Sequence, residues 1–215
     1  MSTKGKGYYK GQELSFDLPA AWKLLAMAEP RDVPAIENLE KAVKAGLNAP
    51  IGTAPLPKLV AKAPNKKVAI ISEDQTRPTI TGPIILVLLN ELNKAGVPDE
   101  NIDVIIGRGT HRVITEEELK AKIGQAVMER VRVSIHDPDG KDLVKMGETV
   151  RGNTVWTNRI VAEAGLKIGV GTCNPHYFAG YGGGAKIVLP GISGRETIKK
   201  NHVLISDPRS IAGIR

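Results

Sequence analysis

From residue 67 onward, apolar runs of strand length alternate with a segment of helical character, and this alternation restricts the fold more than any other feature. The segment 81–97 is apolar, with Pro83 near its start and Gly96 at its end, as helices commonly have. The runs with the length and composition of buried strands are KVAIIS (67–72), NIDVIIG (101–107), VRVSIH (131–136) and LKIGVG (166–171). Together they predict a Rossmann-like α/β domain, with a mainly parallel sheet and helices on both faces.

The first 60 residues lack this rhythm. Residues 8–18 alternate polar and apolar side chains and predict a small N-terminal hairpin, while 32–45 has helical spacing with Asp32 as N-cap. A proline-rich stretch follows and reads as a connector. We therefore predict residues 1–60 as a hairpin, helix and connector packed on the main domain, and 61–215 as the Rossmann-like main domain.

Two further local signals fall inside the main domain. Thr115 and Glu118 have the spacing of a capping box, which places a helix start. Residues 148–159 predict two short strands, and 161–165 a helical turn before the last buried strand.

Composition excludes several classes of protein. Among 215 residues, no apolar run reaches the roughly 18 needed for a membrane span, and no secretory signal is recognisable, so we expect a cytoplasmic protein. One cysteine excludes an internal disulfide. The net charge of +7 raises nucleic-acid binding, but zinc-finger spacing, RNP-like aromatics and an arginine-rich tail are missing. Electrostatic attraction of small anionic substrates explains the positive net charge equally well.

Polar and reactive side chains follow three of the predicted strands. They are Asp74, Thr76 and Arg77 after the first, Thr110, His111 and Arg112 after the second, and Asn174, His176 and Lys186 after the last. Ligands of such sheets bind beyond the carboxyl ends of the strands. The sequence therefore predicts an enzyme site at this edge of the sheet.

The glycine run Gly182, Gly183 and Gly184 has two interpretations. Its exposed amides could cradle a phosphate, or it could be a flexible loop packed by the neighbouring aromatic residues. It is not a Walker P-loop, because Ala185 replaces the glycine of that motif, and 107–112 lacks the third glycine of a dinucleotide fingerprint. ATP and NAD therefore have no motif support, and a non-catalytic phosphate- or nucleotide-binding module stays as the alternative to an enzyme.

Histidines 111, 176 and 202 all lie in loop or helix-end contexts, where imidazole serves as proton shuttle or metal ligand. A lone histidine is more often structural, and we interpret His136 in that way. Because three of them share one edge with Lys186, we expect these four side chains to face a common cavity.

Arg77 and Lys186 each have a functional and a structural interpretation. The guanidinium of Arg77 suits a carboxylate or phosphate, or a surface salt bridge with Asp74. Lys186 lies among apolar residues, which would lower its pKa and favour covalent chemistry, or it could extend along a strand edge into solvent.

The sequence resembles the nickel-dependent lactate racemase family, whose members racemise or epimerise 2-hydroxy acids. The resemblance lies in five motifs that occur in the same order and spacing. They are DQTRP (74–78), GTHR (109–112), PHYFAGYGGGAK (175–186), LPG (189–191) and NH (201–202).

The resemblance implies a lactate-like 2-hydroxy acid substrate and a nickel pincer nucleotide, the nickel complex of pyridinium-3,5-bisthiocarboxylic acid mononucleotide. It implies that Lys186 carries this cofactor covalently, that His202 binds nickel, and that His111 and His176 are the acid–base pair for reversible hydride transfer. Arg77 would lie near the substrate. Asp74, Thr76 and the glycines 182–184 would bind the cofactor.

Members of the family continue into a second α/β domain that closes the cleft. This chain stops soon after His202, so the resemblance implies an N-terminal fragment, or a separate chain that supplies the second domain. It also implies dependence on cofactor-maturation proteins.

Overall fold

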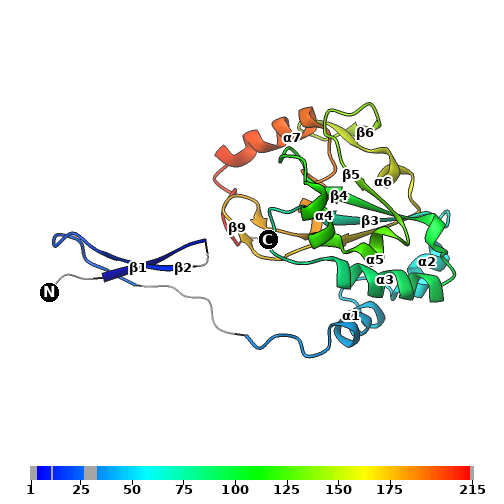
Figure 1. Cartoon of the computed structure of the whole chain (residues 1–215). Helices are drawn as coiled ribbons and strands as arrows, with labels where there is room; N and C mark the ends of the chain where they lie inside the picture. Colours follow the sequence, from blue (N-terminus) through cyan, green and yellow to red (C-terminus); the bar gives the residue numbers. More distant parts are fainter. Residues whose placement is uncertain (1–3, 11, 27–32, 214–215) are drawn as a thin grey trace. The chain divides into compact units, whose positions relative to one another are not determined.

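The computed structural model describes residues 4–10, 12–26 and 33–213, which fall into two compact units, 1–36 and 37–215 (Figure 1). In the first unit, β1 (Lys4–Tyr9) and β2 (Gln12–Asp17) pair antiparallel. Lys10 follows β1 with a φ of 50°, a left-handed conformation typical of tight turns. The predicted hairpin is confirmed.

The second unit is built on a parallel sheet with the strand order β5-β4-β3-β8. Its strands are β3 (Val68–Glu73), β4 (Ile102–Gly107), β5 (Arg132–Ile135) and β8 (Leu166–Val170). Each lies within one of the four predicted apolar runs or one residue beyond it. The predicted Rossmann-like parallel sheet is confirmed.

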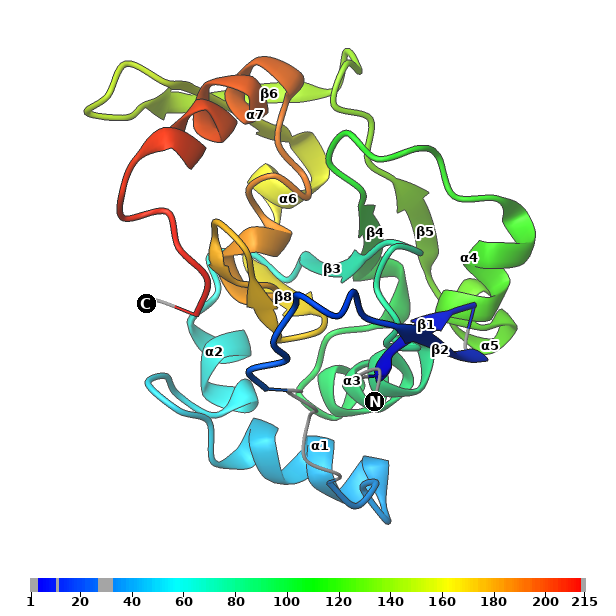
Figure 2. The same cartoon turned by 90° about the vertical axis from the view of Figure 1, so that its left-hand side faces the viewer.

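Successive side chains of β3 supply two separate apolar cores. Val68 and Ile70 pack into the core beneath α3 (Gly82–Lys94), whereas Ala69 and Ile71 pack into the opposite core. Figure 2 shows the strands between α3 on one side and α6 (Arg159–Glu163) on the other. Burying each large aliphatic side chain stabilises the fold by about 1.5–3 kcal/mol. The prediction of helices on both faces is therefore confirmed.

The remaining elements surround this sheet. On the α3 side lie α1 (Leu39–Asn48), α2 (Leu56–Lys62), α4 (Glu116–Ile123) and α5 (Gln125–Met128), and η1 (Asp99–Asn101) precedes β4. A hairpin of β6 (Leu143–Glu148) and β7 (Thr154–Asn158) packs on α7 (Arg195–His202). Shorter pieces are β9 (Pro175–His176), β10 (Gly180–Tyr181), η2 (Gly184–Ile187) and η3 (Val203–Ser206). Within the described residues, no helix is long and apolar enough to cross a membrane.

The N-terminal helix begins later than predicted. Helix α1 starts at Leu39 because the side chain of Asn38 caps it, accepting a hydrogen bond from the Lys41 amide at 2.8 Å. Residues 33–38 are not helical, and the predicted N-cap Asp32 lies outside the described residues. The predicted start was therefore wrong.

The predicted proline-rich connector contains helix α2. Pro55 is its N-cap and Pro57 lies in its first turn, where a missing N–H costs no helical hydrogen bond. Leu56 and Val60 are buried in the core under α3. Residues 37–62 thus group with the sheet, and the division after residue 36 differs from the predicted boundary after residue 60.

Two local predictions have different outcomes. The capping box at the start of α4 is confirmed, since Thr115 and Glu118 each bond the other's amide. Two strands do form before α6, but the first spans residues 143–148, five residues before the predicted start.

Candidate functional site

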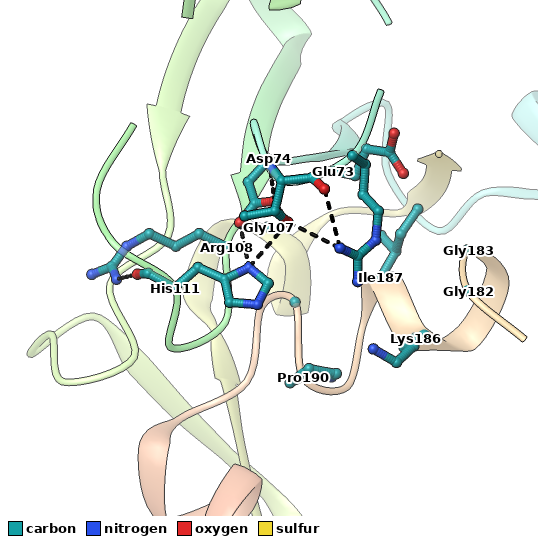
Figure 3. Close-up of a pocket in the computed structure, with 13 residues that line it drawn as sticks. Glu73, Asp74, Gly107, Arg108, His111, Gly182, Gly183, Lys186, Ile187 and Pro190 are labelled. Carbon is teal, nitrogen blue, oxygen red and sulfur yellow. Dashed lines mark hydrogen bonds and ion pairs between the residues drawn. The ribbon is translucent and has the colours of Figure 1, made fainter. Parts of the chain in front are cut away.

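The carboxyl edge of the sheet contains a pocket at the point where the strand order reverses. The chain runs from β3 to β4 and β5 on one side, then returns to place β8 on the other side of β3, which is where ligands bind in such sheets. The pocket is lined by Glu73, Asp74, Thr76, Arg77, Gly107, Arg108, His111, Gly182, Gly183, Lys186, Ile187, Pro190 and Gly191 (Figure 3). Loops after three different strands therefore meet here, as the sequence predicted.

Asp74 and His111 form a hydrogen-bonded dyad in this pocket. The His111 Nδ1 lies 2.6 Å from Asp74 Oδ2, and the Thr76 amide donates to Asp74 Oδ1 at 3.0 Å. Burial favours a raised pKa for Asp74, but hydrogen bonds from His111 and Thr76 outweigh it and hold the pKa below its usual value. Because the ionised carboxylate can only accept, Nδ1 carries the hydrogen and Nε2 is left for proton transfer.

We expect Asp74→Asn to reduce the acid sensitivity of stability. The folded-state pKa of Asp74 is depressed, so its carboxylate stabilises the fold above the unfolded pKa of about 3.9, and this is lost as pH falls through the folded pKa. Urea unfolding between about pH 3 and 7 measures the free energy of unfolding at each pH. The difference in unfolding free energy between wild type and variant should be constant above about pH 5 and shrink below about pH 4. A difference independent of pH would contradict the ionised dyad.

Arg77 is held at the pocket through both its backbone and its side chain. Its carbonyl accepts a hydrogen bond from Lys122 Nζ at 2.9 Å, and its Nη1 donates to Thr76 Oγ1 at 3.1 Å. Among the ion pairs of the described residues, none joins Arg77 to Asp74. The salt-bridge interpretation is thus wrong for this structure, and Arg77 lines the pocket.

Lys186 enters the same pocket from η2, on the side opposite His111 (Figure 3). Burial lowers the pKa of its amine, and the nearby charge of Arg77 lowers it further, while Asp74 acts in the opposite direction. A lowered pKa raises the fraction of neutral, nucleophilic amine. This environment is the one expected from the apolar residues around Lys186.

The glycine run packs against the loop after β8. A Cβ on Gly182 would lie 2.5 Å from Asn174 Oδ1, and one on Gly183, which has a φ of 67°, would lie 2.8 Å from the Thr172 carbonyl oxygen. Gly184 differs, because space beside it is open. It borders a second pocket that also touches Lys186. Two of the glycines therefore allow a close approach of backbone within the chain.

His176 and His202 do not line the pocket that holds His111 and Lys186. Instead the ring of Phe178 contacts both, with centroids 4.6 Å from His176 and 5.7 Å from His202. His176 also stacks on Tyr177 at 4.7 Å. The predicted common cavity is therefore only half realised, because aromatic packing holds the other two imidazoles beside it.

The two rings in this aromatic cluster have different hydrogen-bonding patterns. His202 Nδ1 donates to the Ile198 carbonyl at 3.0 Å, which leaves Nε2 with a free lone pair. His176 Nδ1 faces the Ala179 amide at 3.3 Å. Burial lowers the pKa of His176, and the charges of Lys186, Arg77 and His202 lower it further. His176 is therefore inclined to be neutral near pH 7.

His136 has the structural role predicted for it. It is buried, and its Nε2 donates to the Ser193 carbonyl at 2.9 Å. Three other polar residues near the pocket were missed. Arg108 donates hydrogen bonds to the carbonyls of His136 and His111, and Glu73, which lines the pocket, pairs with Lys122. The sequence did not identify them because charged residues normally lie in solvent. Only the position of Glu73 at the end of a strand indicated that it could lie near the site.

Comparisons with known proteins agree on one family. The family model described as "Lactate racemase N-terminal domain" matches residues 9–213. Lactate racemase of Lactiplantibacillus plantarum is 36% identical over 81% of this chain and 41% of its own length. Lactate racemase of Thermoanaerobacterium thermosaccharolyticum is 34% identical over 96% of this chain and 49% of its own length.

Solved structures agree with the sequence relatives. The lactate racemase apoprotein from T. thermosaccharolyticum superposes with a TM-score of 0.80 at 30% identity, over 99% of this chain and 49% of that one. A protein from Thermotoga maritima superposes with a TM-score of 0.63 at 25% identity, over 81% of this chain and 44% of that one. The chain thus spans about half the length, or less, of the relatives it matches. Since the family model covers nearly every residue, the chain belongs to the lactate racemase N-terminal domain family.

Proposed function

We propose that this chain is the N-terminal half of a racemase or epimerase of a small 2-hydroxy acid. The observation that carries the proposal is the Asp74–His111 dyad facing Lys186 and Arg77 in one pocket, in a member of this family. A base, an anion-binding guanidinium and a reactive amine are what a hydroxy acid and a covalent cofactor require. We infer that a C-terminal α/β domain, such as the relatives' greater length accommodates, completes the cleft.

The residues present fit the nickel pincer nucleotide of this family. The partly buried amine of Lys186, with its lowered pKa, suits covalent attachment through a thioamide. His202 offers Nε2 as a nickel ligand, because its Nδ1 is occupied by the Ile198 carbonyl. The open space at Gly184 suits the phosphate of the cofactor. Asp74 and Thr76 would bind the rest of the nucleotide. When bound, the cofactor supplies reversible acceptance of hydride from the substrate's α-carbon.

The chain's own residues then handle the substrate and its protons. Arg77 binds the carboxylate with its guanidinium. His111 takes the hydroxyl proton at Nε2, and Asp74 orients the ring and stabilises the resulting imidazolium. His176 serves the opposite enantiomer, since its lowered pKa keeps the ring neutral and able to accept a proton. Two histidines are needed because the hydroxyl group of each enantiomer lies on a different face.

Racemisation by the full-length protein tests this function. Made with its maturation proteins, it should convert either pure enantiomer of a 2-hydroxy acid, lactate first, into an equal mixture, which chiral chromatography measures. Protein made without them is the control and should be inactive. Intact-mass and nickel analysis establish loading independently. Loaded protein that converts neither lactate nor other short 2-hydroxy acids would sink the proposal.

A further inference from the structure

A buried ion pair joins Glu73, which lines the pocket, to Lys122 and has no part in the chemistry above. Lys122, near the end of α4, places Nζ 3.2 Å from Oε1 of Glu73, the last residue of β3. The side chains are only 6% and 7% exposed. Two charges withdrawn from water in this way usually give little or no net stability, and apolar replacements are often neutral or stabilising. Fold stability therefore gives a weak reason for this pair.

The other partners of the pair point to a different role. Lys122 Nζ also donates to the Arg77 carbonyl at 2.9 Å, which fixes the loop after β3. The Glu73 carboxylate accepts from the Thr172 amide at 2.6 Å and from Thr172 Oγ1 at 2.8 Å, which fixes the loop after β8. Thr172 Oγ1 in turn accepts from Thr79 Oγ1 at 2.6 Å, which ties the two loops together. Hydrogen bonds to a charged group, such as those of Lys122 and Glu73, are stronger than hydrogen bonds between neutral groups.

The β8 loop connects Thr172 to Lys186 through close backbone contacts. A Cβ on Gly183 would meet the Thr172 carbonyl, and the amide of Lys186 donates to the Gly183 carbonyl at 3.0 Å. Gly171 leaves room for the carboxylate, since a Cβ there would lie 2.8 Å from Glu73 Oε2. A shift of Thr172 would therefore move η2 and its lysine.

We propose that the Glu73–Lys122 ion pair is a positioning element, which holds the Arg77 loop and the Thr172–Lys186 segment at a fixed separation so that guanidinium and amine face one pocket. The inference deepens the proposed function, because it concerns the same site, but it does not require that the reaction be racemisation. Neither residue of the pair is assigned contact with substrate.

The pKa of the Lys186 amine reports this separation without any catalysis. Burial lowers it first, and the charge of Arg77 second, so a displaced Arg77 must let it rise. It can be measured on the 215-residue chain, made with 13C-labelled lysine and otherwise unmodified, by 13C NMR titration, with Lys186→Arg assigning the signal. The variant is Glu73→Gln/Lys122→Met, which removes both charges together. Lys120→Met, on the exposed side of α4 and paired with Glu116, is the matched control.

In the double variant, the pKa of Lys186 should rise toward that of the surface lysines in the same spectrum, whereas Lys120→Met leaves it unchanged. Lys122→Arg, which keeps the positive charge, should stay close to wild type. Circular dichroism confirms that each variant is folded. An unchanged Lys186 pKa in the folded double variant overturns the proposal, whether or not the full-length protein is a racemase.

Thr172→Val covers the case in which the double variant does not fold. It keeps both charges and removes only the hydroxyl bonds to Glu73 and Thr79. The Lys186 pKa should shift in the same direction by a smaller amount. A value equal to that of wild type would again contradict positioning by this network.

Discussion

Replacing either His111 or His176 by alanine in the loaded full-length enzyme is expected to slow racemisation by a factor of about 10²–10⁴, the usual contribution of a general acid or base. Each direction of reaction needs both rings, one to take the hydroxyl proton and the other to return it. The enantiomers have equal free energy, so kcat/KM must be the same in both directions. Each single variant should therefore lose both directions together, measured by chiral chromatography from each pure enantiomer.

Cofactor loading is the control for this pair of variants. Both proteins should keep the covalent mass on Lys186 and their nickel, because neither ring is assigned to hold the cofactor. Added imidazole should restore part of the activity by replacing the missing ring. Near-normal interconversion by both variants would refute the assignment of the two histidines. Loss of nickel from His176→Ala would instead move that residue to the metal.

The sheet was predictable because its two central strands, β3 and β4, are buried on both faces and therefore have continuous apolar sequences. Val68 and Ile70 face one core and Ala69 and Ile71 the other, which leaves no polar position in that part of β3. Helix α2 was not predicted because it contains prolines. Its prolines normally signal a break, and only their place in the first turn makes them compatible with a helix.

The meeting of Asp74, Arg77 and His111 in one pocket followed from the predicted parallel sheet, since parallel strands end at a common edge. The position of His176 did not follow, because its ring packs on Tyr177 and Phe178 and local aromatic contacts have no signature at the level of strands. The ion pair of Lys122 was hidden as well. A lysine in a charged helix is normally solvent-exposed, and only the tertiary approach of α4 to β3 buries this one.

Lys186→Arg in the full-length enzyme is expected to abolish both covalent cofactor and racemisation, to below detection. The amine of Lys186 has a pKa lowered by burial and by Arg77, so a larger fraction of it is neutral and nucleophilic than of an exposed lysine. A guanidinium keeps the positive charge but is always protonated and cannot form the bond. Intact-mass spectrometry should find the adduct on wild type and not on Lys186→Arg. Lys199→Arg, an exposed change on α7, should load and react normally.

His202→Ala separates attachment from metal binding in the same experiment. Its ring is held by the Ile198 carbonyl with Nε2 free, so its removal should cost nickel but leave the mass on Lys186. Peptide mapping should therefore find the adduct in His202→Ala and not in Lys186→Arg, whereas metal analysis should find little nickel in either variant. An adduct that persists in Lys186→Arg, or that maps to a peptide without residue 186, would show that the cofactor is carried elsewhere. The pocket shared by Lys186 and the Asp74–His111 dyad would then no longer place the cofactor beside its base.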